Sequence, residues 1–276
     1  MTARGIFLPA AAAVASLGIV MADDVPQRYF DLMGESDAAI AEGRLAHADS
    51  CLTEAIAMQP GNPSNVLLMS NLGMVRFGMG SDSLALATLD AAHEMAPRST
   101  VVLRNRARVL TAMGETARAS ADYELLMRLD SMAVTPRFYH GMIALRNGDL
   151  AVAADDFRRL RDIAPDTLET HVGLASLSMA AGDYADAERH YTAALRKEVQ
   201  PEYYAARALC RLMTDRLGEA SDDIARGLEL DPLDPSLYLY RAMLNKMRYR
   251  PDDAEADGRR AVELGADPQQ VESVLR

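Results

Sequence analysis

The 276-residue chain contains no tryptophan, and aromatic residues make up only 5% of it. Most of the core must therefore be built from alanine, leucine and the 16 methionines. Two cysteines, Cys51 and Cys210, are too few for a disulfide framework. Basic residues are also in deficit, 29 against 40 acidic ones, which gives a formal net charge of −11. Because an acidic chain is repelled by phosphates, we expect no nucleic-acid partner and no binding to an anionic membrane surface.

The motifs of common catalytic sites are also missing. The chain has no G-x-S-x-G, P-loop, H-E-x-x-H or paired C-x-x-C. His47 and Cys51 lie four residues apart and would share one helix face. Two ligands could begin a zinc site, but four are usual and no others are evident. We therefore expect structural roles for both residues, and we predict no enzyme activity, no catalytic residue, no metal and no cofactor.

The N-terminus, residues 1–22, has the pattern of a secretory signal peptide. Arg4 gives a short positive segment, Ile6–Val20 is apolar, and Ala22 supplies a small residue for cleavage. We expect export, to the periplasm or the outside of the cell. The alternative is a membrane anchor through residues 5–22, although roughly 20 apolar residues are needed to span a bilayer. No later stretch is apolar enough, so the mature chain should have no membrane span.

What the chain does contain is a repeat. A glycine recurs every 34 residues, at Gly80, Gly114, Gly148 and Gly182, and Gly43 precedes this series by 37 residues. A small residue recurs before the glycine, at Ser36, Gly73, Ala107, Gly141, Ala175, Ala208 and Ala242. Another recurs after it, at Ala48, Ala85, Ala119, Ala153, Ala187, Ala220 and Ala254. The glycine predicts the end of one short helix, and the small residues predict close contact with a second. In the unit around Gly182, Asp183 is the candidate N-cap of the second helix.

These columns resemble the tetratricopeptide repeat (TPR) family. The resemblance implies an all-α, right-handed superhelical solenoid of about seven helix–turn–helix repeats over residues 23–267, with residues 268–276 as a short C-terminal cap. Three positions depart from the pattern. Asp215 and Tyr249 replace the turn glycine in repeats 6 and 7, and Gly258 leaves a hole where other repeats have a bulky side chain. Cys51 and Cys210 fall in repeats 1 and 6, too far apart to form a disulfide bond.

The resemblance also implies a concave groove lined by the first helices, which binds an extended peptide or a partner helix. The candidate groove residues are Asn71, Met74, Phe77, Arg104, Asn105, Arg108, Phe138 and Met142. Arg104 and Arg108 are one helical turn apart, so both guanidinium groups could reach one anion. Asn71 and Asn105 could hold a peptide backbone, and methionine suits variable apolar ligands. Paired acids on the second helices, Asp155 and Asp156, Asp222 and Asp223, are expected on a solvated outer face.

We expect a non-enzymatic module for protein–protein interaction, which binds a protein or peptide in the groove as an exported scaffold or assembly factor. One alternative is an architectural subunit of an envelope complex that docks through its ends or its convex face. Another is a regulatory arm of an enzyme complex. The set of residues that grips the C-terminal tails of cytosolic chaperones in some TPR proteins is present only at Asn105, so that subtype is not expected.

Overall fold

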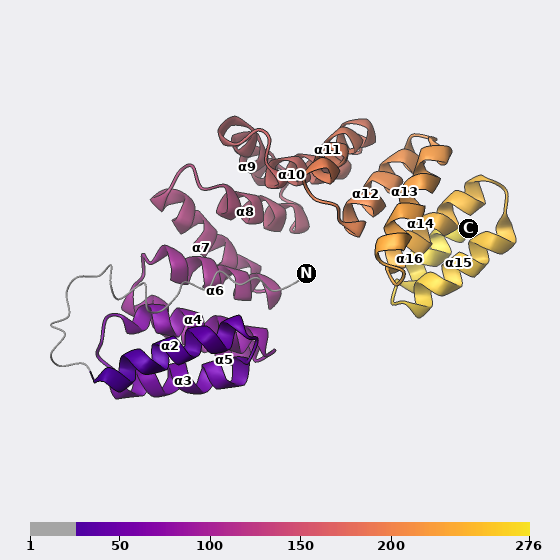
Figure 1. Ribbon diagram of the computed structural model, residues 1–276. Coiled ribbons are helices and arrows are strands. Elements are labelled where there is room, and N and C mark those ends of the chain that lie inside the picture. Colours follow the sequence, from indigo (N-terminus) through magenta and orange to yellow (C-terminus); the bar gives the residue numbers. More distant parts are fainter. Residues whose placement is uncertain (1–25) are drawn as a thin grey trace. The chain divides into compact units, whose positions relative to one another are not determined.

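The computed structural model describes residues 26–276, in which fifteen helices and no strand are found (Figure 1). The predicted signal peptide, residues 1–22, lies outside the described residues. The first helices of the repeats are α2 (Gln27–Ala41), α4 (Asn65–Gly78), α6 (Thr100–Ala112), α8 (Val134–Arg146), α10 (Leu168–Ala180), α12 (Pro201–Met213) and α14 (Pro235–Met247). The second helices are α3 (Leu45–Met58), α5 (Asp82–Met95), α7 (Thr116–Leu129), α9 (Leu150–Ile163), α11 (Tyr184–Lys197), α13 (Leu217–Leu230) and α15 (Pro251–Glu263), and α16 (Pro268–Leu275) follows. The predicted all-α solenoid of paired helices is confirmed.

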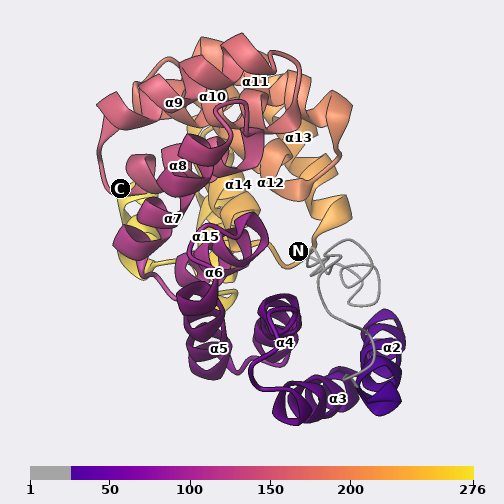
Figure 2. The ribbon, with the colours of Figure 1, turned by 90° about the vertical axis from the view of Figure 1, so that its left-hand side faces the viewer.

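The described chain divides into two compact units, residues 26–136 and Arg137–Arg276. In the first unit, α2 pairs with α3, α4 with α5 and α6 with α7, and α4 also lies beside α6 (Figure 2). In the second unit, α10 pairs with α11, α12 with α13 and α14 with α15, and α12 lies beside α14. Each unit is therefore a double layer, with first helices in one layer and second helices in the other. None of the helices in residues 26–276 has the length and apolar character needed to cross a bilayer.

The turn inside each pair is formed as the sequence predicts. Gly182 has a φ of 77° and donates its backbone N–H to Met179, while the N–H of Asp183 reaches back to Ser178. This pair of bonds satisfies carbonyl groups that the end of α10 would otherwise leave without partners. The side chain of Asp183 then accepts a hydrogen bond from the N–H of Asp186, 3.0 Å away, and caps α11. Both the predicted turn glycine and the predicted N-cap are confirmed.

Asp215 and Tyr249 adopt the same backbone conformation as the glycines they replace. Each has a φ of 58°, a region that side chains with a Cβ atom rarely occupy. The N–H groups of Arg216 and Arg250 still reach back to the preceding helix, to Arg211 and Asn245. The packing of the helix pairs therefore keeps the turn conformation even where the residue is not glycine. The strain is greatest at Tyr249, because tyrosine lacks the short polar side chain with which aspartate can offset it.

We expect Tyr249→Gly to raise the free energy of unfolding by about 0.5–1 kcal/mol, because glycine adopts positive φ without steric cost. Tyr249 is 94% exposed, so its side chain contributes little packing. Thermal unfolding followed by circular dichroism would measure the gain. Tyr249→Ala is the matched control, since it removes the same ring and keeps the Cβ atom. An equal gain from alanine would show that the backbone conformation is not the cause.

Our prediction for the acidic pairs was wrong for one member of each. Asp155 and Asp222 are exposed, but Asp156 and Asp223 are only 4% and 2% exposed. Each buried carboxylate pairs with a basic residue 16 positions earlier, on the first helix of the same repeat. The same column pairs a basic side chain with an aspartate in four repeats, as Arg106–Asp122, His140–Asp156, Arg207–Asp223 and Arg241–Asp257. These acids hold the two helices of a repeat together.

The space expected at Gly258 is filled in part by the last helix, and an open pocket remains beside it. A Cβ atom at this position would lie 3.0 Å from both Val271 and Leu275 of α16. The last helix therefore approaches the backbone of α15 where the other repeats carry a bulky side chain. Both cysteines are free thiols, as predicted, and both are buried.

Candidate functional site

The surface of the first unit carries a cationic pair, Arg104 and Arg108, on α6. They are one turn apart and therefore project from the same face of the helix. Both side chains are partly exposed, and the Arg108 guanidinium lies 6.0 Å from the centre of the Phe77 ring on α4. Because α4 and α6 lie side by side, this arrangement joins two successive repeats. It combines positive charge with an apolar ring, which suits a ligand carrying both properties.

The cationic pair differs from the arginine between its members. Arg106 points to the second helices, where it donates to both carboxylate oxygens of Asp122, at 2.8 and 2.6 Å, and to Asp90 at 3.2 Å. Within residues 26–276, no carboxylate pairs with Arg104 or Arg108. These two arginines lie on one helix face, and no carboxylate of residues 26–276 pairs with them. They are therefore available to bind an anion.

The remaining candidates of the first unit are not exposed. Asn71, Met74 and Asn105 are 2%, 4% and 3% exposed. The Asn105 amide donates to the Ser70 hydroxyl, 2.9 Å away, across the contact between α6 and α4. This donor joins two helices of the protein itself, and the role of Asn105 in holding a peptide backbone stays a prediction. Close packing of α4 on α6 buries the positions beside the seam, and Phe77 remains partly exposed at its edge.

Phe138 and Met142 belong to the second unit, on α8. The Phe138 ring lies 6.5 Å from Phe157 of α9 and 5.2 Å from Tyr139. Both Phe138 and Met142 are partly buried. The structure therefore groups Phe138 with the packing of repeat 4. The partly exposed candidates that lie in the first unit are Phe77, Arg104 and Arg108.

A second group of polar side chains lies in repeat 1. The Cys51 thiol of α3 is 3.7 Å from the Nε2 atom of His47, as expected for residues one turn apart. The Oε2 atom of Glu35, on α2, is also 3.7 Å from the same sulfur. Burial raises the pKa of the Cys51 thiol, and the charge of Glu35 raises it further. The sequence placed His47 and Cys51 on one helix face but did not identify Glu35 as their neighbour. The signal that could have identified it is the 16-residue spacing between Glu35 and Cys51.

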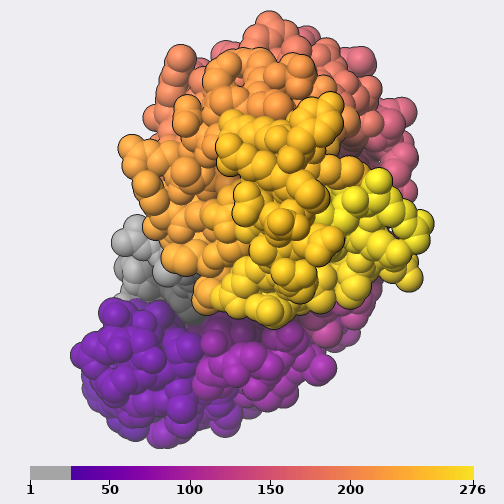
Figure 3. Space-filling model, turned by 90° about the vertical axis from the view of Figure 1, so that its right-hand side faces the viewer, coloured from indigo at the N-terminus to yellow at the C-terminus, as the bar shows by residue number. Residues whose placement is uncertain are grey.

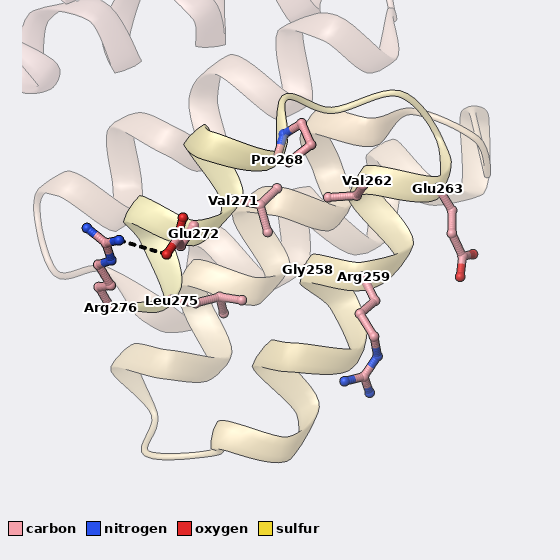
Figure 4. Close-up of a pocket in the computed structure, with 9 residues that line it drawn as sticks. All are labelled: Gly258, Arg259, Val262, Glu263, Pro268, Val271, Glu272, Leu275 and Arg276. Carbon is pink, nitrogen blue, oxygen red and sulfur yellow. Dashed lines mark hydrogen bonds and ion pairs between the residues drawn. The ribbon is translucent and has the colours of Figure 1, made fainter.

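A cavity of about 560 Å³ lies between α15 and α16 (Figure 4). Gly258 and Val262 line it from α15, and Val271 and Leu275 line it from α16, with the Arg276–Glu272 ion pair at one side. The terminal helices lie at the surface of the second unit, where they appear in yellow in Figure 3. The lining is mostly apolar and offers no constellation of groups for catalysis.

Comparison with known proteins agrees with the repeat pattern. Residues 104–166 and residues 144–210 match two family models, both described as tetratricopeptide repeat. No curated protein gives a significant match. Together these family matches extend from the first helix of repeat 3 to the first helix of repeat 6.

Several solved structures have a similar fold. A tetratricopeptide repeat protein from Parabacteroides merdae ATCC 43184 is 24% identical; the alignment covers 91% of this chain and 98% of that one, with a TM-score of 0.75. PilW, described as a widely conserved type IV pilus biogenesis factor, is 16% identical over 76% of this chain and 98% of its own, with a TM-score of 0.65. YrrB, described as a TPR protein with an unusual peptide-binding site, is 19% identical over 67% of this chain and 96% of its own, with a TM-score of 0.50. At these identities the likeness is one of fold.

Proposed function

The chain belongs to the tetratricopeptide repeat family, and on that premise we propose that it is a non-enzymatic scaffold that holds an acidic, extended segment of a partner protein. The segment binds along α4 and α6 of the first unit. Arg104 and Arg108 bind its carboxylates, and the Phe77 ring contacts its apolar side chains. The observation that carries this proposal is a cationic pair with no carboxylate partner in residues 26–276, beside a partly exposed aromatic ring.

The charge distribution supports an acidic ligand. The protein has a net charge of −11, so an acidic segment is repelled by most of its surface and attracted at the cationic pair. A few charge-assisted hydrogen bonds to the cationic pair fix the position of such a segment on the protein. Repulsion by the acidic surface elsewhere disfavours binding in other positions. Among proteins of similar fold, YrrB is described as having a peptide-binding site, which agrees with a role in binding a protein segment.

An exported assembly factor is the cellular role that we propose. It rests on the signal-peptide pattern of residues 1–22 and on the similarity in fold to PilW, which is described as a pilus biogenesis factor. The architectural alternative, docking through an end of the chain, has one supporting observation. The cavity between α15 and α16 has an apolar lining at the surface of the terminal repeat.

We expect the double variant Arg104→Ala/Arg108→Ala to bind the partner roughly ten- to a hundredfold more weakly, since hydrogen bonds to a charged group contribute about 1.5–3 kcal/mol. A photo-reactive amino acid at position 77 would first capture the ligand from native cells, and mass spectrometry would identify the crosslinked segment. A synthetic peptide of that segment would then be titrated calorimetrically with each variant.

The matched control is Arg158→Ala/Arg159→Ala, which removes the same charge from two exposed positions on α9. Its affinity for the peptide should stay within about twofold of the original, because these exposed charges belong to α9, outside the proposed site, and exposed charges are screened by salt. An Arg104/Arg108 variant that keeps its unfolding temperature and its full affinity for the partner would contradict the proposed site. In that case docking through the terminal repeat would become the better explanation.

A further inference from the structure

Glu35, His47 and Cys51 place three different ligand atoms around one point of repeat 1. His47 and Cys51 are one turn apart on α3, and Glu35 faces them from α2. The Cys51 sulfur is 3.7 Å from His47 Nε2 and 3.7 Å from Glu35 Oε2, and all three atoms lie within 4.8 Å of one another. This is the one such group of three or more potential ligands found among residues 26–276.

These separations match the edges of a tetrahedral metal site. Zinc binds sulfur at about 2.3 Å, imidazole nitrogen at about 2.0–2.1 Å and carboxylate oxygen at about 2.0–2.2 Å. At tetrahedral angles, the sulfur lies roughly 3.5–3.6 Å from the nitrogen or the oxygen, and the nitrogen and oxygen lie roughly 3.3–3.4 Å apart. The two contacts to sulfur therefore need to close by only a fraction of an ångström. The His47 and Glu35 atoms, which lie within 4.8 Å of each other, close further by rotation of the exposed His47 side chain.

The position of the cluster in the repeat also favours a cation. Glu35 and Cys51 are 16 residues apart, the spacing at which four other repeats place a basic residue of the first helix against an aspartate of the second. In repeat 1, both members of this column, Glu35 and Cys51, are acids, so the column itself supplies no cation. Arg28 pairs with the other oxygen of Glu35, so Oε2 and the sulfur are the atoms of this column that a metal ion could join.

The surroundings orient the ligands and leave a path for the metal. Arg28 donates to Glu35 Oε1 at 2.6 Å, which holds the carboxylate so that Oε2 faces the sulfur. The same guanidinium contacts Glu54 at 3.3 Å, so a second carboxylate offsets its positive charge. Hydrogen bonds of this kind to ligating groups raise metal affinity. Cys51 is buried, whereas His47 is exposed, so the metal can enter from solvent on the histidine side.

From this geometry we propose that Glu35, His47 and Cys51 bind one zinc ion, with water as the fourth ligand. The site joins the two helices of repeat 1 and does not depend on the proposed binding of a partner at Arg104 and Arg108. A mixed set of sulfur, nitrogen and oxygen ligands suits zinc better than magnesium or calcium, which bind oxygen almost exclusively. Zinc binding stabilises the repeat because the unfolded chain does not hold the three groups together.

The experiment uses cobalt(II) as a spectroscopic substitute for zinc in the full chain, after reduction and removal of metal with a chelator. One equivalent of cobalt should produce a thiolate-to-metal charge-transfer band in the near ultraviolet and the strong visible bands of a four-coordinate site. Zinc should then abolish both. Cys51→Ser should remove the charge-transfer band, while Cys210→Ser, the control for the other buried thiol, should retain it.

His47→Ala and Glu35→Gln keep the thiol and test the remaining ligands, and His47 is exposed, so its loss leaves the core intact. Each should weaken zinc at least about tenfold, the loss seen even when supporting groups outside the ligand set are removed. The proposal is overturned if cobalt gives no charge-transfer band, if Cys210→Ser abolishes the band, or if both single variants bind zinc as tightly as the original chain. Such results would assign the contacts to a hydrogen-bonded thiol.

Discussion

Replacing Phe157 with alanine is expected to lower the free energy of unfolding by about 3–5 kcal/mol, the usual cost of removing a buried phenylalanine ring. Phe157, on α9, is completely buried and is one of the largest buried side chains in the protein. Its ring lies against two glycines: a Cβ atom would stand only 2.6 Å from it at Gly141 of α8 and 2.5 Å from it at Gly173 of α10. One ring thus fills the contact between repeats 4 and 5.

Urea unfolding followed by circular dichroism would measure this loss, since the chain has no tryptophan to report by fluorescence. Arg158→Ala is the control, because the neighbouring residue on α9 is exposed and alanine is an equally good helix former. Its effect should stay within about 0.5 kcal/mol. An equal loss from both variants would mean that the ring is not the main contact between the repeats.

A double variant sharpens this test. Gly141→Ala alone should destabilise the protein, because the added methyl group overlaps the ring. In the Phe157→Ala background the same methyl group enters the space that the ring leaves, so Gly141→Ala should there raise stability. This reversal of sign is a direct measure of contact between positions 141 and 157. Additive effects would contradict it.

The repeat fold could be predicted because its signals are local and repeated. A turn such as that at Gly182 depends on the conformation of one residue, and the same requirement recurs about every 34 positions. Even the departures follow from this: Asp215 and Tyr249 take the glycine conformation because the pairs on either side require it. The space expected at Gly258 is taken in part by a later segment, α16, which packs against that position and leaves an open pocket beside it.

The buried ion pairs were missed because they join helices. Asp222 and Asp223 look alike in sequence, but neighbouring residues on a helix project about 100° apart. If one of them faces solvent, the other can face the first helix. Only the basic residue 16 positions earlier, Arg207, distinguishes them, and its meaning depends on how the two helices pack. The same spacing would have identified Glu35 as a neighbour of Cys51.

The candidate site stays a prediction, and only some of its geometry could be read from the sequence. Arg104 and Arg108 are related by one helical turn, so their common face follows from sequence. The burial of Asn71, Met74 and Asn105 depends on contact between α4 and α6, which belong to different repeats. A column that faces a groove in one repeat protein can be covered in another when neighbouring first helices approach more closely, as the Asn105–Ser70 hydrogen bond shows here.

The column of ion pairs carries the other large expected effect: Asp223→Ala should lower the free energy of unfolding by about 3–5 kcal/mol. Asp223 is 2% exposed and accepts hydrogen bonds from Arg207 at 2.9 and 2.6 Å and from Arg211 at 2.8 Å. Removing this carboxylate leaves two guanidinium groups with little access to water and without this partner. Arg211 keeps Glu188 as a partner, at 2.8 Å, so most of the cost falls on Arg207. The Arg207 guanidinium keeps a hydrogen bond to the Thr192 hydroxyl. A buried charge that loses its carboxylate partner is not rehydrated.

Asp222→Ala is the matched control for this variant. It makes the identical change one residue away, at an exposed position of α13, and should alter stability by no more than about 0.5 kcal/mol. Asp223→Asn should fall between the two, because the amide keeps the shape and one acceptor but removes the charge that offsets both arginines. Urea unfolding of the three variants, followed by circular dichroism at one salt concentration, gives the comparison. If Asp222→Ala and Asp223→Ala unfold at the same urea concentration, the buried carboxylate does not hold α12 against α13, and apolar packing alone joins the helices of repeat 6.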